Sequence, residues 1–308
     1  MPKEKIFVIG HKSPDTDTVC SSIAYAGYLE KKEKINAVAA VFGDLNPETK
    51  FVLKNFGFKA PPKLASAAGK ALVLVDHNEK SQMPDGADSA KIVEVLDHHK
   101  IAFEWPEPIK FHTEPAGSTA TLVAKIMLTD KFKISRQMAG ILVSAILSDT
   151  VVFKSATTTP VDIKIAKQLA KTAKIANLKK FGIEIKKRKA SLKGLAAGQI
   201  LRSDFKTFEA DGKKFGVGQI EVVDLKEAQA RAGEILKEME ETNAKEGLAF
   251  TALMVTDIIN EGTELLVSGD TSYIQKAFGQ PSESGTLYVK GMLSRKKDLL
   301  PPLLKTLG

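Results

Sequence analysis

Four short apolar runs in the first third of the chain limit its fold more than any other feature. They occupy residues 5–10, 37–42, 71–76 and 91–97, and none alternates cleanly between apolar and polar residues. Strands buried on both faces of a parallel sheet have this continuous apolar character. Helical spacing of apolar residues appears between and after the runs, so we predict an α/β domain with a doubly wound parallel sheet.

The pattern changes after a basic segment at residues 184–194, and a chain of 308 residues suits two domains. We predict a first domain over 1–186, a flexible basic linker over 187–194 and a smaller α/β domain over 195–308. Asp211-Gly212 lies between two strand-like stretches and predicts a hairpin in the smaller domain.

Further elements of the smaller domain should make its sheet a mixed one. We expect one charged helix and then three strands, at about 225–243, 249–259, 264–269 and 286–294. We expect a last helix that is interrupted by Pro301-Pro302, because proline breaks a helix interior.

Composition excludes several classes of protein. A single cysteine, Cys20, rules out an intrachain disulfide and a thiolate metal site. No apolar stretch approaches the length of a membrane span, and the N-terminal residues lack a signal peptide's apolar segment, so we expect a cytoplasmic protein without a membrane partner. The net charge of +8 favours anionic partners. No aromatic residues interleave with the basic run, so we expect no nucleic-acid partner.

Histidine and aspartate residues follow three of the predicted strands. These residues are His11, Asp15 and Asp17, then Asp76 and His77, and then Asp97, His98 and His99. A predicted helix ends at Asp149. Because the carboxyl ends of parallel strands meet at one edge of a sheet, we expect these side chains to converge on one crevice.

Two histidines and four aspartates offer more ligands than one ion usually takes from a protein, and they fit two ions with a bridging carboxylate. Imidazole and carboxylate donors without thiolate suit Mn²⁺, Co²⁺ or Zn²⁺, and Mg²⁺ where carboxylates dominate. Simpler roles stay open, since Asp15 or Asp17 can cap the next helix, His77 can be a solvated loop residue and Asp149 a polar helix end. We treat His112, which belongs to no motif, as structural.

Six segments together resemble the DHH phosphoesterase superfamily, named for the triplet seen here as Asp97-His98-His99, and most closely family II inorganic pyrophosphatase. They are residues 11–18, 75–78, 96–99, 114–121, 144–155 and 294–297. The resemblance implies a metal-binding DHH domain at 1–186, a substrate-binding domain at 195–308 and an active site in the cleft between them.

The resemblance also implies individual roles. His11 and Asp15 are then ligands of one ion, Asp17, His98 and Asp149 of the second, and Asp76 of both. His99 contacts substrate and assists proton handling, and Asp97 orients an imidazole. His77 and Asn78 lie beside the bridge, as supporting or substrate contacts. The cations that clamp phosphate are Lys206, Arg295 and Lys296.

The expected reaction is hydrolysis of pyrophosphate to two orthophosphates by a hydroxide that bridges the ions. The expected cofactors are two Mn²⁺ or Co²⁺ per subunit, with additional Mg²⁺ bound with the substrate, and the expected assembly is a homodimer. A short-chain polyphosphatase of the same superfamily is an alternative. A DHH exonuclease or nanoRNA-degrading enzyme is another, although the chain lacks the Gly-Gly pair of those enzymes.

Overall fold

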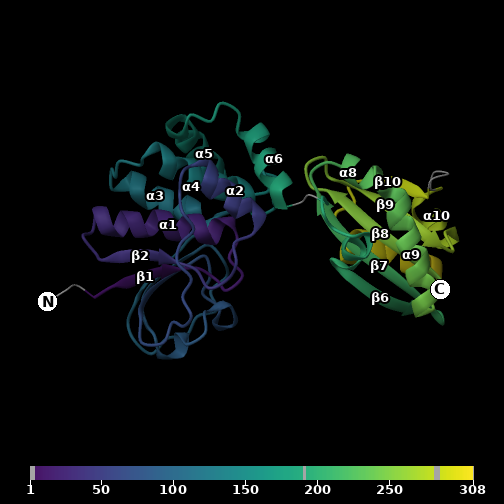
Figure 1. The fold of residues 1–308 in the computed structure, drawn as a ribbon, viewed down its shortest axis with the longest axis horizontal. Helices are drawn as coiled ribbons and strands as arrows, with labels where there is room; N and C mark the ends of the chain where they lie inside the picture. The colour runs from purple at the N-terminus through teal and green to yellow at the C-terminus, as the bar shows by residue number, and fades with distance from the viewer. Residues whose placement is uncertain (1–3, 190–191, 281–284, 308) are drawn as a thin grey trace. The chain divides into compact units, whose positions relative to one another are not determined.

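The computed structural model describes residues 4–189, 192–280 and 285–307 (Figure 1). The chain forms two compact units, Met1–Lys189 and Ala190–Gly308. Helix α6 (Leu178–Lys189) extends three residues into the predicted linker, so these residues are helical, and residues 190–191 of that linker lie outside the described residues. None of the described helices combines the length and the apolar character needed to cross a membrane.

The first unit is built on a parallel sheet of five strands. In sequence order they are β1 (Ile6–Ile9), β2 (Ala37–Ala40), β3 (Ala71–Val75), β4 (Lys91–Asp97) and β5 (Lys110–Thr113). Their spatial order is β2-β1-β3-β4-β5, and every neighbouring pair is parallel. The four apolar runs thus form the predicted strands. Strand β5 was not predicted, because its four residues KFHT lie at the edge of the sheet and none of them is fully buried.

Helices and irregular segments cover the two faces of this sheet. The long helices of the unit are α1 (Thr16–Lys31), α2 (Pro47–Asn55), α3 (Thr119–Thr129), α4 (Arg136–Asp149), α5 (Pro160–Ala173) and α6. α1 and α3 contact the sheet, while α4 packs behind them and contacts α5 and α6 (Figure 1). Two short 3₁₀ turns, η1 (Lys80–Gln82) and η2 (Ala87–Ser89), lie against an apolar cluster on the sheet. The cluster contains Met83, which follows η1, and Ala87 and Ala90, which begin and follow η2.

The second unit contains the predicted mixed sheet. Its strands are β6 (Phe205–Ala210), β7 (Lys213–Val222), β8 (Phe250–Asp257), β9 (Gly262–Gly269) and β10 (Thr286–Lys290), in the spatial order β10-β9-β8-β7-β6. Only the β7–β8 pair is parallel. Asp211 and Gly212 join β6 to β7, and both have positive φ (48° and 67°), as a two-residue hairpin turn requires.

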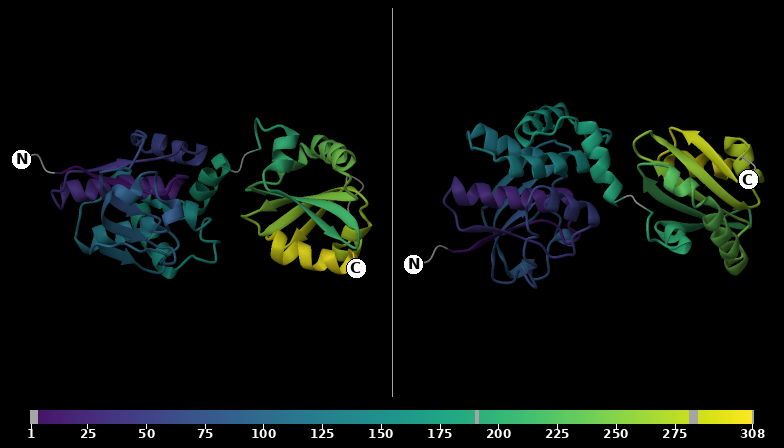
Figure 2. Two further views of the ribbon diagram at one scale, coloured as in Figure 1. Left: turned by 90° about the horizontal axis from the view of Figure 1, so that it is seen from below. Right: turned by 45° about the horizontal axis from the view of Figure 1, so that its top comes forward.

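Helices lie on both faces of the second sheet, with α7 and α9 on one face and α10 and α11 on the other (Figure 2). They are α7 (Ala197–Arg202), α8 (Lys226–Gln229), α9 (Ala232–Glu246), α10 (Ser272–Phe278), the π-helix η3 (Arg295–Leu299) and α11 (Leu300–Leu307). The single charged helix predicted after residue 225 is two helices, α8 and α9.

The last helical segment changes type directly before Pro301-Pro302, because the π-helix η3 ends at Leu299 and α11 begins at Leu300. The predicted interruption is therefore a change from π-helix to α-helix, and the helical backbone continues. α11 begins at Leu300, so both prolines lie in its first turn. Backbone N–H groups in a first turn have no intrahelical partner, and the fixed φ of proline suits this position. The first turn of α11 therefore accepts both prolines.

Candidate metal centre

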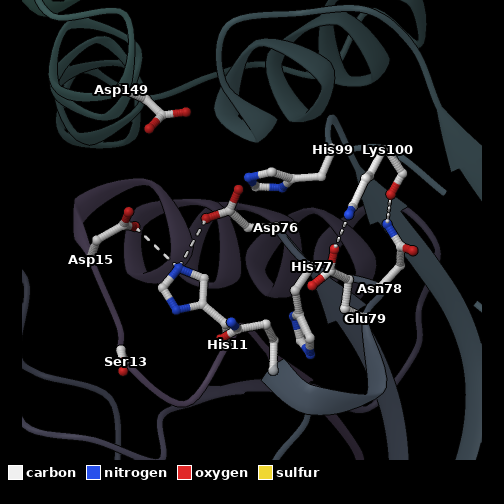
Figure 3. A pocket seen from close by; sticks show the side chains of 11 residues that line it. His11, Ser13, Asp15, Asp76, His77, Asn78, Glu79, His99, Lys100 and Asp149 are labelled. Atoms are coloured by element: carbon white, nitrogen blue, oxygen red, sulfur yellow. Dashed lines mark hydrogen bonds and ion pairs between the residues drawn. The ribbon is translucent and has the colours of Figure 1, made fainter. Parts of the chain in front are cut away.

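Three strand ends and one helix end bring the predicted ligands together in the first unit. His11 follows β1, Asp76 follows β3, His98 follows β4 and Asp149 ends α4. β1 lies between β2 and β3, so the strand order reverses there, and ligands bind at such a point in open α/β sheets. A cavity of about 530 Å³ opens at this edge, and it is lined by His11, Asp15, Asp76, His99 and Asp149, among others (Figure 3).

One set of donors contains His11, Asp15 and Asp76, which turn toward one another in Figure 3. His11 Nε2 is 3.8 Å from Asp15 Oδ1 and 3.7 Å from Asp76 Oδ2. Asp15 also caps α1 by accepting a hydrogen bond from the backbone N–H of Thr18 (2.9 Å). Asp15 therefore caps α1 and also lies beside His11.

A second set contains Asp17, His98 and Asp149. His98 Nδ1 lies 2.8 Å from the backbone oxygen of Ala116, to which it can only donate. Nε2 is therefore the ring nitrogen left for a proton or a metal ion, and it is 3.4 Å from Asp76 Oδ1 and 3.3 Å from Asp149 Oδ2. This nitrogen is buried and has no hydrogen-bond partner among the described residues. A ring nitrogen that faces two carboxylates can bind a cation once its proton has left.

The N-terminus of α3 holds Asp17 in place. Asp17 accepts hydrogen bonds from the backbone N–H groups of Thr119 (2.6 Å) and Ala120 (2.9 Å) and from the hydroxyl of Ser118 (2.8 Å). The side chain is buried, and a helix N-terminus favours a negative charge. The carboxylate is therefore fixed in one orientation before any ion binds.

Two hydroxyl groups orient Asp76, whose carboxylate lies near both His11 and His98. Thr18 Oγ1 donates to Asp76 Oδ2 (2.6 Å), and Thr119 Oγ1 donates to Asp76 Oδ1 (3.0 Å). The backbone of Asp76 has φ of 63°, in the left-handed region. Asp and Asn adopt this conformation more readily than most residues, which suits an aspartate at this strand end.

The metal-free site retains protons because four carboxylates lie close together. Burial, and then the Asp76 charge, raise the pKa of Asp149 to about 7 and hold the pKa of Asp17 well above its ordinary value. Burial lowers the pKa of His98, but the nearby carboxylate of Asp76 outweighs burial and raises that pKa to about 10. Protons thus occupy positions that divalent ions can take.

Asp97 and Asn78 hold His99 at the edge of the cavity. His99 Nδ1 is 2.8 Å from Asp97 Oδ1, and the other oxygen of this buried carboxylate accepts from Asn78 Nδ2 (2.6 Å). The hydrogen bond to Asp97 raises the pKa of His99, whose ring is about half exposed. Asn78 is buried, and its Nδ2 also donates to the backbone oxygen of Lys100 (Figure 3). Its Oδ1 accepts a hydrogen bond from the backbone N–H of Ala102.

His77 lines the same cavity but is itself buried. Its Nδ1 is 3.0 Å from the backbone oxygen of Val75, and its ring lies edge-on to that of His11 with centroids 6.5 Å apart. Burial lowers the pKa of His77, so the ring is neutral at neutral pH. The solvated-loop alternative for His77 is therefore wrong, since only 3% of the residue is exposed.

The chain leaves α4 through an unusual turn directly after Asp149. Val151, Val152 and Phe153 have positive φ (49°, 56° and 67°), which is a rare conformation for β-branched and for bulky residues. The backbone N–H of Val152 donates to the carbonyl of Leu147 (2.8 Å), so the turn satisfies a carbonyl at the end of α4. This strain must be balanced by the surrounding packing.

The three predicted phosphate-binding cations lie together in the second unit. Lys206, Arg295 and Lys296 line a cavity of about 410 Å³, and both lysines are exposed. Arg295 is buried, and its two terminal nitrogens bond Asp204 and backbone oxygens of Asp204 and Val217. Asp204 was not singled out from the sequence, although it lies two residues before Lys206.

Sequence reasoning also missed the groups that orient the carboxylates, namely Thr18, Ser118 and Thr119. All three lie within motifs that the sequence analysis quoted, but small hydroxyl residues are too common in loops and caps to signal such a role. His112, treated as structural, lies 3.0 Å from Glu114 and lines none of these donor sets.

The donor atoms fit divalent ions of the manganese type. The two sets use imidazole nitrogens and carboxylate oxygens only, which suits borderline and hard ions. Several carboxylates gather around His98 Nε2, two of them buried (Asp17 and Asp76), and a divalent cation at this point would compensate their charge.

Comparison with known proteins first gives the class. Residues 5–146 match the DHH family, N-terminal domain, and residues 183–306 match the DHHA2 domain. The first match contains β1 to β5 and most of the donor residues, and the second contains the cavity with Lys206 and Lys296. The two matches define a DHH-type protein with a C-terminal DHHA2 domain.

Individual relatives give the family. The chain is 42% identical over 305 residues to a manganese-dependent inorganic pyrophosphatase of Methanocaldococcus jannaschii, covering 96% of this chain and 97% of the relative. It is 42% identical over 304 residues to one from Methanothrix thermoacetophila, covering 97% of each. A crystal structure titled as a family II inorganic pyrophosphatase of Methanococcus jannaschii has 41% identity and a TM-score of 0.65, covering 98% of this chain and 99% of its own. The chain therefore belongs to the manganese-dependent, family II inorganic pyrophosphatases, which confirms the resemblance seen in the sequence.

Proposed function

We propose that this chain hydrolyses inorganic pyrophosphate to two orthophosphates with two bound Mn²⁺ or Co²⁺ ions. The observation that supports this most directly is a pair of neighbouring His/Asp donor sets, in a chain similar over nearly its whole length to manganese-dependent pyrophosphatases. Asp76 belongs to one set and lies 3.4 Å from His98 Nε2 of the other. His11, Asp15 and Asp76 would hold one ion. Asp17, His98 and Asp149 would hold the other, with Asp76 shared. Further Mg²⁺ that enters with the substrate belongs to the same proposal.

When bound, the two ions supply positive charge for the transferring phosphoryl group and lower the pKa of a water molecule. The residues of the chain then move protons and support the groups around the ions. His99 offers Nε2 toward the cavity, because Asp97 occupies its Nδ1, so it can hold or release a proton at that atom. Asn78 and His77 are placed as supporting groups, because both are buried and Asn78 is fully hydrogen-bonded within the protein.

Positive charge for the phosphate oxygens comes from the second unit in this proposal. Lys206 and Lys296 are exposed and line one cavity, so their ammonium groups can contact an anion directly. Arg295 adds charge beneath them, but Asp204 must release its guanidinium before it can bind phosphate with both terminal nitrogens. The predicted linker, 187–194, is proposed as the hinge, with its first three residues in α6, and 195–308 is proposed as the substrate-binding domain.

Alanine at Lys206 or Lys296 is expected to raise KM for pyrophosphate by about 10-fold or more. One charge-assisted hydrogen bond contributes about 1.5–3 kcal/mol. Steady-state kinetics at saturating Mn²⁺ measure the effect. Lys297→Ala is the matched control, since Lys297 is exposed on the same turn and does not line the cavity. An equal rise of KM in Lys297→Ala would show that general charge, and not this cavity, binds the substrate.

Phosphate release from pyrophosphate tests the function itself. We expect activity to disappear after chelation and to return best when Mn²⁺ or Co²⁺, rather than Zn²⁺ or Mg²⁺, is added back alone. Asp149→Ala is expected to lose metal affinity and activity together, because it removes one donor that faces His98 Nε2. Full activity of Asp149→Ala would exclude this ligand set, and faster turnover of tripolyphosphate than of pyrophosphate would favour a polyphosphatase.

A homodimer and a cytoplasmic location complete the proposal. Strand β5 is an edge strand of the first sheet with a short polar sequence, so its free edge can pair with a second copy. The only cysteine, Cys20, is buried and forms no disulfide in the structure, and we propose a reducing compartment on this basis. The mass in solution, measured by light scattering, tests the dimer.

A further inference from the structure

A buried carboxylate outside the donor sets contacts two of the segments that carry the donors. Glu48 lies in the first turn of α2 and is 1% exposed. Its Oε1 accepts hydrogen bonds from Thr16 Oγ1 (2.8 Å) and from the hydroxyl of Ser148. Thr16 lies between Asp15 and Asp17 in the sequence, and Ser148 precedes Asp149. Glu48 Oε1 is therefore hydrogen-bonded to residues that are direct sequence neighbours of three proposed ligands, Asp15, Asp17 and Asp149.

The second oxygen of Glu48 faces a lysine from another helix. Glu48 Oε2 is 3.5 Å from Lys186 Nζ and has no hydrogen-bond partner among the described residues. Lys186 Nζ donates to the backbone oxygen of Ser148 (3.3 Å), and the lysine side chain is only 12% exposed. The ammonium group thus compensates the buried carboxylate and also bonds the last turn of α4.

Helix α6, which carries Lys186, packs against both of these segments. Figure 1 shows α6 beside α2 and α4, and contacts with each are present. Arg188 lies over the ring of Phe51 (4.3 Å to the centroid), and Phe181 packs edge-on against Phe56. A Cβ atom at Gly182 would lie 2.9 Å from Val152 Cγ2, so α6 also presses on the left-handed turn that follows Asp149.

We propose that Glu48 and Lys186 are positioning residues of the metal centre, through which the packing of α6 and the binding of metal stabilise each other. The contacts run from Lys186 through Glu48 to the segments of Asp15, Asp17 and Asp149. Because α6 is the last element of the first unit, the chain that leads to the second unit starts from a helix fixed in this way. The inference rests on the proposed function only in that these aspartates bind metal.

The affinity for Mn²⁺ and the stability of the attached α6 must affect each other by the same factor. If the attachment of α6 raises the affinity for Mn²⁺, then bound Mn²⁺ must stabilise the attachment of α6 by the same factor. A buried ion pair with a purely structural role would change the stability of the protein without this reciprocity. Metal affinity and amide exchange in α6 therefore separate the two roles.

The test uses Glu48→Gln, Lys186→Met and Lys186→Arg in the full chain. Glutamine can still accept from Thr16 and Ser148 but leaves the ammonium group unpaired, and methionine keeps the aliphatic packing without the charge. Titration calorimetry is expected to show Mn²⁺ binding weakened by about 10-fold or more in Glu48→Gln and Lys186→Met, the range seen for groups that orient metal ligands. Lys186→Arg keeps a cation and is expected to restore most of the affinity.

Glu94→Gln is the matched control. Glu94 is another buried carboxylate of the first unit, paired with Lys110 (2.8 Å) and bonded by the hydroxyl of Tyr25 (2.7 Å), and neither partner adjoins a proposed ligand in the sequence. We expect it to lower the melting temperature with unchanged Mn²⁺ affinity. Hydrogen exchange supplies the second readout, since Mn²⁺ should slow exchange in α6 of the unsubstituted protein and much less in Lys186→Met.

Mn²⁺ affinities equal to that of the unsubstituted protein in both Glu48→Gln and Lys186→Met would overturn the inference. Asp149→Ala separates this failure from failure of the proposed function, because it should still lose Mn²⁺ in that case. If Glu48→Gln does not fold, the comparison of Lys186→Met with Lys186→Arg decides. Absence of Mn²⁺ binding in the unsubstituted protein would overturn the proposed function and this inference together.

Discussion

Replacing Asp76 with asparagine is expected to abolish pyrophosphate hydrolysis, with a loss of at least about 10³-fold. Asp76 Oδ2 lies near His11 and Asp76 Oδ1 near His98, so both proposed ions lose a charged ligand at once. Each ion supplies several kcal/mol of charge stabilisation, and each 1.36 kcal/mol corresponds to a factor of ten in rate. Phosphate release at saturating Mn²⁺ and the metal content after gel filtration measure the two losses.

The fold is expected to survive the same substitution. Asparagine adopts the left-handed backbone conformation of residue 76 readily, and its amide can exchange hydrogen bonds with the hydroxyls of Thr18 and Thr119. It also removes a charge that raises the pKa of Asp17 and Asp149. The metal-free variant should therefore melt within a few degrees of the metal-free parent.

Asp130→Asn is a suitable control, because Asp130 is an exposed carboxylate that accepts from Tyr28 and belongs to none of the donor sets. It should leave activity and metal content unchanged. Two ions per chain and more than a tenth of the activity in Asp76→Asn would show that Asp76 is not the shared ligand.

The donor cluster was predictable because strand ends are predictable. Continuous apolar runs identified the strands, and the carboxyl ends of parallel strands meet at one edge, so His11, Asp76 and His98 had to lie near one another. Asp149 could be added because a carboxylate at the C-terminus of a helix needs a compensating cation. These inferences depend on periodicity and on general rules of topology, which a single sequence contains.

The supporting contacts were not predictable for a physical reason. Glu48, Lys186 and Ser148 come from three different helices, and their contact depends on how α2, α4 and α6 pack. Sequence periodicity does not predict contacts between side chains of helices that are distant in the sequence. The ion pair of Arg295 with Asp204 was not predictable either. The motif around Arg295 predicted that this side chain binds an anionic substrate, but not that a carboxylate of the protein occupies it.

Two local predictions differ from the structure because the effect of a residue depends on its position within a helix or a sheet. Pro301-Pro302 predict an interruption of the last helix, but the structure has only a change from the π-helix η3 to α11 there, because both prolines lie in the first turn of α11. Strand β5 has no apolar run because an edge strand with half-exposed side chains needs none. In both cases the tertiary arrangement, and not the composition of the segment, determines the outcome.

Saturating Mn²⁺ is expected to raise the melting temperature of the protein more at pH 8 than at pH 6. In the metal-free fold the pKa of Asp149 is about 7 and that of His98 about 10, both above their ordinary values of 3.8 and 6.5. The folded state therefore binds more protons than the unfolded chain, so metal-free stability falls as pH rises from about 4 to 7 through Asp149 and from about 6.5 to 10 through His98. Mn²⁺ needs the same positions unprotonated, so its affinity rises over this range.

The size of the effect follows from mass action. A ligand at 100 times its dissociation constant adds about 2.7 kcal/mol to the stability of the folded state, which for a unit of this size corresponds to a rise of about 5–10 °C. Scanning calorimetry with chelator or with Mn²⁺ at each pH measures the shift. Asp149→Ala should lose both the Mn²⁺ stabilisation and the part of the metal-free pH dependence that lies between pH 4 and 7. Metal-free protein that gains stability from pH 6 to pH 8 would contradict the argument, because protons would then not be the competitors that Mn²⁺ displaces.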